Sequence, residues 1–285
     1  MTVEHVQLGT GPPKRGELQS FYPPKFTWWQ LKLFINSGDL GLLKRDKKLQ
    51  ERYREWSLRI KEEYGSIVDY LLNYRLQWGR PDRLSLLPSQ LDYVEIPLCE
   101  LPEDAPIPEY FTADTPSSLI SIIQNDWPYS VPLEVEHSVI WTKIPILPRP
   151  SLIMPHIAAN LPYDLQQKLT ARLAQDGLRG FTGSVDPPPS VSLLADNLGA
   201  LSDWGITIDK LIISPKGTLE EEEAVRQSSL EVQRFVARRW IEREWETAWF
   251  VNPPRLQSVK GLAHIHVFAR KKNPEEVAAW NALDN

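Results

Sequence analysis

The stretch Gly261-Leu262-Ala263-His264-Ile265-His266-Val267-Phe268-Ala269-Arg270 places two histidines two residues apart within an apolar, β-branched run. Such a run favours a β-strand. Because strand side chains alternate between faces, we expect His264 and His266 on one face and Ile265 and Val267 on the other. Histidine has the side-chain pKa nearest neutral pH, so the pair is suited to proton transfer or metal binding. The alternative is a pair of hydrogen-bonded core histidines without chemistry.

The composition fits a globular protein, since 42% of the 285 residues are hydrophobic and the formal net charge is −5. RNA binding would therefore need a local basic stripe. Cys99 is the only cysteine, which excludes an internal disulfide and fits a cytoplasmic location. No apolar run reaches the ~20 residues of a membrane span, so we expect no membrane contact. Neither a glycine-rich phosphate loop nor standard zinc-ligand spacing is present, and we predict no cofactor and no metal.

The first third of the chain has helical periodicity. Residues 1–26 are rich in Gly, Pro and Lys and predict a flexible N-terminal arm. The apolar stripe Leu49, Tyr53, Trp56 and Ile60 predicts a helix over 44–63. The other side of that helix is either a solvated charged face or a tRNA-binding stripe formed by Arg45, Lys48, Arg52 and Arg59.

Strand and helix signals alternate in the remaining chain. Residues 138–144 predict a strand, and Pro162 to Gly177 predicts a helix. Thr218 and Glu221 form a capping-box pattern that begins the longest helix. We predict an α+β fold in which an N-terminal helical region packs on a small, mainly antiparallel sheet. One domain is expected over 27–285, with a helical part over 27–80 and the sheet plus helices over 81–285.

Two polar segments are candidates for a site with the histidine strand. The first runs from Asn125 to His137, and paired carboxylates there are suited to holding a guanidinium. The second, residues 252–258, supplies amide and guanidinium donors. The predicted catalytic residues are His264, His266, Glu136 and His137. The predicted substrate-binding residues are Asn125, Asp126, Trp127, Tyr129, Glu134, Trp141, Asn252, Arg255 and Gln257. We expect the two imidazoles of the strand to open into a cavity that the 125–137 segment also walls.

The order Gln257-Ser258-Val259, short gap, His264-Ile265-His266 resembles histidine-triad nucleotide hydrolases and transferases, although the third histidine position is Phe268. This similarity implies a histidine-triad-like core. Three longer blocks resemble the fungal N-acetylglucosamine-induced protein family: residues 125–129, residues 136–143 and residues 244–267. We associate the fungal arginine-containing cyclodipeptide synthases with the same group. Their acidic Asp-Asp-x-x-Glu motif has its nearest counterpart here in Asn125-Asp126-Trp127-Pro128-Tyr129.

The resemblance implies an aminoacyl-tRNA-dependent cyclodipeptide synthase that joins arginine and a second amino acid into a diketopiperazine. Under that interpretation the chain is an acyl transferase whose partners are aminoacyl-tRNA and a small-molecule substrate. The first alternative is a histidine-triad-like nucleotide or sugar-nucleotide hydrolase or transferase, with His266 as the nucleophile. The second is a non-catalytic regulatory binding protein.

Overall fold

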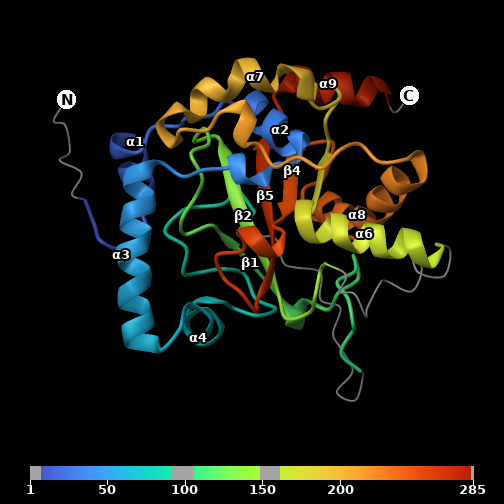
Figure 1. The fold of residues 1–285 in the computed structure, drawn as a ribbon. Helices are drawn as coiled ribbons and strands as arrows, with labels where there is room; N and C mark the ends of the chain where they lie inside the picture. Colours follow the sequence, from blue (N-terminus) through green and yellow to red (C-terminus); the bar gives the residue numbers. More distant parts are fainter. Residues whose placement is uncertain (1–7, 92–105, 148–160, 284–285) are drawn as a thin grey trace.

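A five-stranded antiparallel sheet with the order β1-β2-β5-β4-β3 forms the centre of the computed structural model (Figure 1). The structure describes residues 8–91, 106–147 and 161–283, so Cys99 lies outside the described residues. The strands are β1 (Ile120–Gln124), β2 (Val135–Thr142), β3 (Leu178–Thr182), β4 (Trp245–Val251) and β5 (Ala263–Lys271). The predicted α+β class with an antiparallel sheet is confirmed. The histidine strand is β5, at the middle of the sheet.

One face of the sheet packs on two long helices, α6 (Tyr163–Asp176) and α8 (Leu219–Arg239). Ile265 and Val267 of β5 are fully buried there. The capping box at Thr218 and Glu221 forms as predicted and begins α8. This face is a continuous apolar core because the β-branched residues of β5 all point into it.

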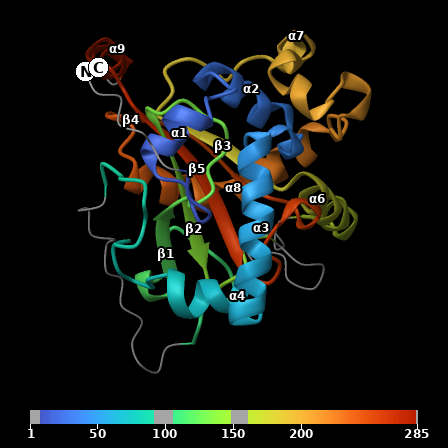
Figure 2. The same ribbon diagram turned by 90° about the vertical axis from the view of Figure 1, so that its left-hand side faces the viewer.

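The N-terminal helices cover the opposite face, as the sequence predicts (Figure 2). Leu31 and Phe34 of α2 (Trp28–Ser37) pack with Phe250 and Phe268, and α7 (Leu194–Asn197) joins this cluster. The helix α3 (Lys47–Tyr64) buries Leu49, Trp56 and Ile60 of the predicted stripe. The remaining elements are α4 (Ile67–Tyr70) with a π-helical turn (Leu71–Arg75), α9 (Pro274–Leu283) and short 3₁₀ turns at Leu40–Leu42, Ser117–Leu119, Val191–Leu193, Leu198–Trp204, Ile208–Lys210 and Pro254–Leu256.

Part of the segment predicted to be a flexible arm is folded onto α3. Within residues 8–26, α1 (Arg15–Phe21) forms, and Tyr22 and Phe26 are buried. Glu17 of α1 is only 4% exposed and accepts a hydrogen bond of 2.8 Å from Nη1 of Arg52. The sequence of residues 8–26 does not reveal this docking on α3, because the residue that anchors the segment, Arg52, lies on a different helix.

Register places the three described histidines on one face. On β5, His264 stands opposite Trp141 of β2, and His266 stands between Val139 of β2 and Phe250 of β4. His137 pairs with Phe268 and so shares that face. The predicted alternation of β5 is therefore confirmed. Within the described ranges, no helix is long and apolar enough to cross a membrane.

Candidate functional site

His137 and His266 form a hydrogen-bonded pair in the interior. Nε2 of His137 lies 3.0 Å from Nδ1 of His266. The backbone N–H of Tyr129 donates to Nδ1 of His137 at 3.2 Å, so a neutral His137 carries its proton on Nε2 and donates it to His266. His266 then holds its own proton on Nε2, facing the side-chain amide of Asn252, whose nitrogen is 3.4 Å away. Hydrogen bonding thus runs from Tyr129 through His137 to His266 and ends there, because the amide nitrogen of Asn252 cannot accept a hydrogen bond.

Burial keeps these imidazoles neutral. It lowers the pKa of both His137 and His266 well below the usual histidine value, and the nearby Arg45 guanidinium lowers both further. Burial also lowers the pKa of His264, against a hydrogen bond of 3.0 Å between its Nδ1 and the Leu262 carbonyl. We therefore expect the three imidazoles to be uncharged at neutral pH.

Aromatic rings enclose the pair. The Tyr129 ring lies 5.0 Å from that of His137 and 5.6 Å from that of His266, measured between centroids. Phe250 stacks on His266 at 4.7 Å, and Phe268 lies 4.2 Å from His137. The expectation that the strand histidines open into a cavity is wrong, because these rings seal His266.

The third ring, His264, is sealed in the same way, since it packs against Trp141 at 4.5 Å between ring centroids. Both nitrogens of His266 face protein side chains, so the geometry gives no support to a phosphate nucleophile there. The catalytic roles of His264 and His266 stay predictions.

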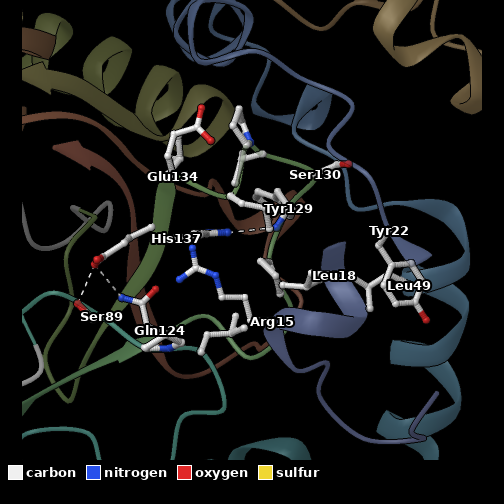
Figure 3. A pocket seen from close by; sticks show the side chains of 18 of the residues that line it. Arg15, Leu18, Tyr22, Leu49, Ser89, Gln124, Tyr129, Ser130, Glu134 and His137 are labelled. Carbon is white, nitrogen blue, oxygen red and sulfur yellow. Dashed lines mark hydrogen bonds between the residues drawn. The ribbon is translucent and has the colours of Figure 1, made fainter. Parts of the chain in front are cut away.

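A pocket of about 410 Å³ lies at the beginning of β2, next to the histidine pair (Figure 3). Its walls are α1, the N-terminal end of α3, the loop 87–90 and residues 128–137, together with Gln124 of β1 and Lys271 of β5. The predicted acidic segment does border a cavity. The imidazole that lines this cavity is His137, which adjoins His266 behind it.

The two predicted carboxylates, Glu134 and Glu136, both line this pocket but differ in their contacts. Glu136 accepts hydrogen bonds from the Ser89 hydroxyl at 2.7 Å and the Gln90 backbone N–H at 2.8 Å, so it anchors the loop 87–90. Glu134 precedes the strand in a turn and is exposed. Among the described residues it has no hydrogen-bond or ion-pair partner. Glu134 is consequently the carboxylate available to a ligand.

Asp126 binds a guanidinium, but the guanidinium belongs to the chain itself. Nε and Nη2 of Arg75 donate to its two carboxylate oxygens at 2.7 and 2.8 Å, and Arg75 also pairs with Asp82 at 2.9 Å. Burial raises the pKa of Asp126, and the Arg75 guanidinium opposes that rise. Asp126 is therefore not a free substrate ligand, which corrects the prediction.

Other predicted binding residues form the frame behind the pocket. The Asn125 carboxamide oxygen accepts from the Trp127 backbone N–H at 2.9 Å, and the indole of Trp127 packs 5.1 Å from that of Trp56. Burial raises the pKa of Tyr129, against a hydrogen bond from the Asn252 side chain. These contacts fix the position of the Tyr129 ring, which forms part of the pocket wall.

Two predicted binding residues lie away from the pocket. Gln257 donates to the Asn252 carbonyl at 3.1 Å, and Arg255 donates to the Gln175 carbonyl at 3.2 Å. Neither lines the pocket. Their position in the sequence, just before β5, led to the prediction. The chain turns through Pro254–Leu256, however, and Arg255 reaches the C-terminal end of α6 while Gln257 folds back on Asn252.

The predicted tRNA-binding stripe is not a continuous exposed surface. Arg52 is buried against Glu17, and Arg45 donates to the Trp127 carbonyl at 2.7 Å. Arg59 is exposed but donates to the Thr10 carbonyl at 2.7 Å, while Lys48 is exposed. Three of the four cations thus bind other parts of the chain: Arg52 and Arg59 of α3 contact residues 10–17, and Arg45, just before α3, contacts Trp127.

Several pocket residues were missed by reasoning from the sequence. Gln124 at the end of β1 was recognisable only through the register that sets it opposite Ser138. Further missed residues lie in and next to α1 and in the loop 87–90, where no local motif marks them: Arg15, Leu18, Tyr22, Leu87, Pro88, Ser89 and Gln90. Asp46 before α3 and Lys271 at the end of β5 were missed as well. Within the part of the chain that the structure describes, no group of three His, Cys, Asp or Glu side chains is placed to hold a metal ion.

Fold and site together define a mixed α/β protein with an antiparallel five-stranded sheet and a charged pocket at the beginning of β2. Residues 27–174 and 207–270 match the family described as "Protein of unknown function (DUF3605)". This match covers most of the chain, and the chain belongs to that family.

A curated relative, N-acetylglucosamine-induced protein 1 of Candida albicans, is 30% identical over 154 residues. The alignment covers 51% of this chain and 54% of the relative, so it spans about half the relative's length. The resemblance to N-acetylglucosamine-induced proteins is confirmed. A solved structure titled "Crystal Structure of HTC1" aligns over 90% of this chain and 94% of its own, with 19% identity and a TM-score of 0.39.

Proposed function

We propose that this chain is an acyl transferase of the cyclodipeptide synthase type, which joins arginine and a second amino acid delivered as aminoacyl-tRNA. The observation that carries the proposal is the carboxylate of Glu134, which has no partner among the described residues and lines a pocket of about 410 Å³. A volume of this size suits a small-molecule ligand. A carboxylate pairs strongly with a guanidinium or an ammonium group, and an arginyl residue carries both.

The chemistry asks little of the protein beyond alignment. An aminoacyl ester is already activated, so the amine of one residue attacks the ester carbonyl of the other. A C–N bond forms, the C–O bond to the first ribose breaks, and the amine proton passes to the leaving ribose oxygen, which gives a dipeptidyl ester on the second tRNA. The free amine of this dipeptide then attacks the remaining ester in the same way, so the ring closes as the second C–O bond breaks and the second ribose hydroxyl leaves. Holding the two acyl groups in line is the main source of rate in such a step. Glu134 would hold the arginyl group by its positive charge.

The buried histidine pair supports the wall of this site. His137 accepts the Tyr129 backbone N–H, and Asn252 contacts both His266 and the Tyr129 side chain. Removal of either imidazole is expected to displace Tyr129. If the histidines transfer protons directly, His137→Gln and His266→Gln should also change the pH profile of the rate. If they only position the wall, the rate should fall by the same factor at every pH.

The test is incubation of the protein with arginine, each other amino acid, ATP, the synthetases and tRNA, followed by mass detection of cyclic dipeptides. Glu134→Gln should lower the rate about tenfold or more, because it removes a charge-assisted contact. Glu62→Gln, an exposed carboxylate on α3, is the matched control and should leave the rate unchanged. If no cyclic dipeptide forms although the tRNA is shown to be charged, the proposal is contradicted. The result would then favour the alternative of a binding protein.

A further inference from the structure

Five charged side chains line the pocket, and two of them are already used by the fold. The Asp46 carboxylate caps α3 by accepting from the Lys48 backbone N–H at 2.9 Å, and Glu136 anchors the loop 87–90. The other three, Arg15, Lys271 and Glu134, have neither a hydrogen bond nor an ion pair through their side chains to any described residue. The pocket therefore presents free charges of both signs.

The helix that carries Arg15 is held in place, although the Arg15 side chain itself is exposed and unpaired. It belongs to α1, which is anchored by the buried Glu17 carboxylate. Glu17 accepts from the backbone N–H groups of Gly9 at 2.7 Å and Lys14 at 2.8 Å, besides pairing with Arg52 at 2.8 Å. Figure 3 shows Arg15 reaching from α1 into the pocket, while Glu134 comes from the strand side. A cation on a fixed support loses less entropy when it binds a ligand than a cation on a loose chain.

We propose that the pocket binds a dipolar ligand, with an anionic oxygen group of the ligand on Arg15 and an ammonium or guanidinium group on Glu134. This inference deepens the proposed function, because it states which charge contacts each end of an arginyl substrate. The anionic group has two possible sources with the same chemistry: the carboxylate of a free amino acid, or the phosphate next to the terminal adenosine of tRNA. The planar guanidinium of Arg15 is suited to either.

The experiment measures binding by calorimetry and needs no product formation. The carboxylate arm compares L-arginine with L-arginine methyl ester. The phosphate arm compares 3′-(L-arginyl)amino-3′-deoxyadenosine with and without its 5′-phosphate. In at least one arm the anionic member should bind the wild type about tenfold more tightly, and Arg15→Gln should remove that preference. Arg54→Gln, an exposed arginine on α3 outside the pocket, is the control and should retain it.

Each of three results would overturn the inference: equal affinity within both arms, loss of the preference in Lys271→Gln but not in Arg15→Gln, or no detectable binding of any probe. Glu134→Gln should weaken every probe, because all of them keep the cationic group. The outcome is separable from that of the synthase assay. A dipolar ligand can bind without cyclic dipeptide forming, and cyclic dipeptide can form in a protein whose affinities are equal within both arms.

Discussion

The histidines of β5 illustrate how a residue's surroundings decide its role. Alternation along the strand correctly predicts that His264 and His266 share a face. What covers His266 on that face comes from other segments, chiefly the Tyr129 and Phe250 rings, while Phe268 of β5 itself packs on His137. His137, predicted from the sequence to be catalytic, is both the hydrogen-bond partner of His266 and the imidazole in the pocket wall.

The buried pair predicts a pH dependence of stability. The folded-state pKa of His137 and His266 is depressed below the usual 6.5, so the unfolded chain binds more protons than the folded one below that pH. Their contribution to the free energy of unfolding is present above about pH 6.5 and is lost as the pH falls toward the folded pKa. The double variant His137→Phe/His266→Phe should lose less free energy of unfolding than the wild type when the pH falls from about 7.5 to about 5, as measured by denaturant unfolding. Parallel losses would contradict this account.

A second prediction at the residue scale concerns Arg75. Its side chain is 5% exposed and neutralises Asp126 and Asp82. Arg75→Met should lower the free energy of unfolding by about 3–5 kcal/mol, because two poorly solvated carboxylates lose their counter-charge. Arg80→Met, in the exposed loop that follows, is the control and should cost little. Equal costs for the two variants in urea unfolding would show that the ion pairs contribute nothing.

Among the elements, α1 is the one that sequence patterns failed to reveal. It is seven residues long, too short to display helical periodicity, and its anchor is the ion pair between Glu17 and Arg52. The stripe of α3, by contrast, repeats through a helix of 18 residues and was recognised from the sequence. Short elements held by distant partners are the part of a fold that local periodicity does not encode.

The docking of α1 can be tested through Arg52. Arg52→Leu should release α1, because Glu17 would be left buried without its counter-charge. Hydrogen exchange of the amides in residues 15–21 should then become faster, and ligands that need Arg15 should bind more weakly. Arg54→Leu, exposed on the same helix, should leave exchange in α1 unchanged. Unchanged exchange in Arg52→Leu would mean that apolar contacts of Tyr22 alone hold the helix.

At the scale of the whole molecule, the sheet separates the core built with α6 and α8 from the face on which the candidate pocket lies. Ile265 and Val267 face the core built with α6 and α8, whereas the pocket lies among the elements that cover the other face. Ile265→Ala should therefore lower the free energy of unfolding by about 2–5 kcal/mol while the affinity for L-arginine stays at the wild-type value. Calorimetry beside urea unfolding checks both halves. A matching loss of affinity would show that the two faces are coupled.

The sequence by itself determined the strand and helix periods, the face that each β5 residue occupies and the capping of α8, since all of these depend on residues that are neighbours in the chain. The sequence blocks that resemble a family were equally recognisable without a structure. Only the tertiary structure decided which charges stay free. Asp126 meets Arg75, 51 positions away in the sequence, and Glu17 meets Arg52, 35 positions away. An ion pair between distant segments leaves no periodic trace in the chain, so the unpaired charges of Arg15 and Glu134 became recognisable only after the chain was folded.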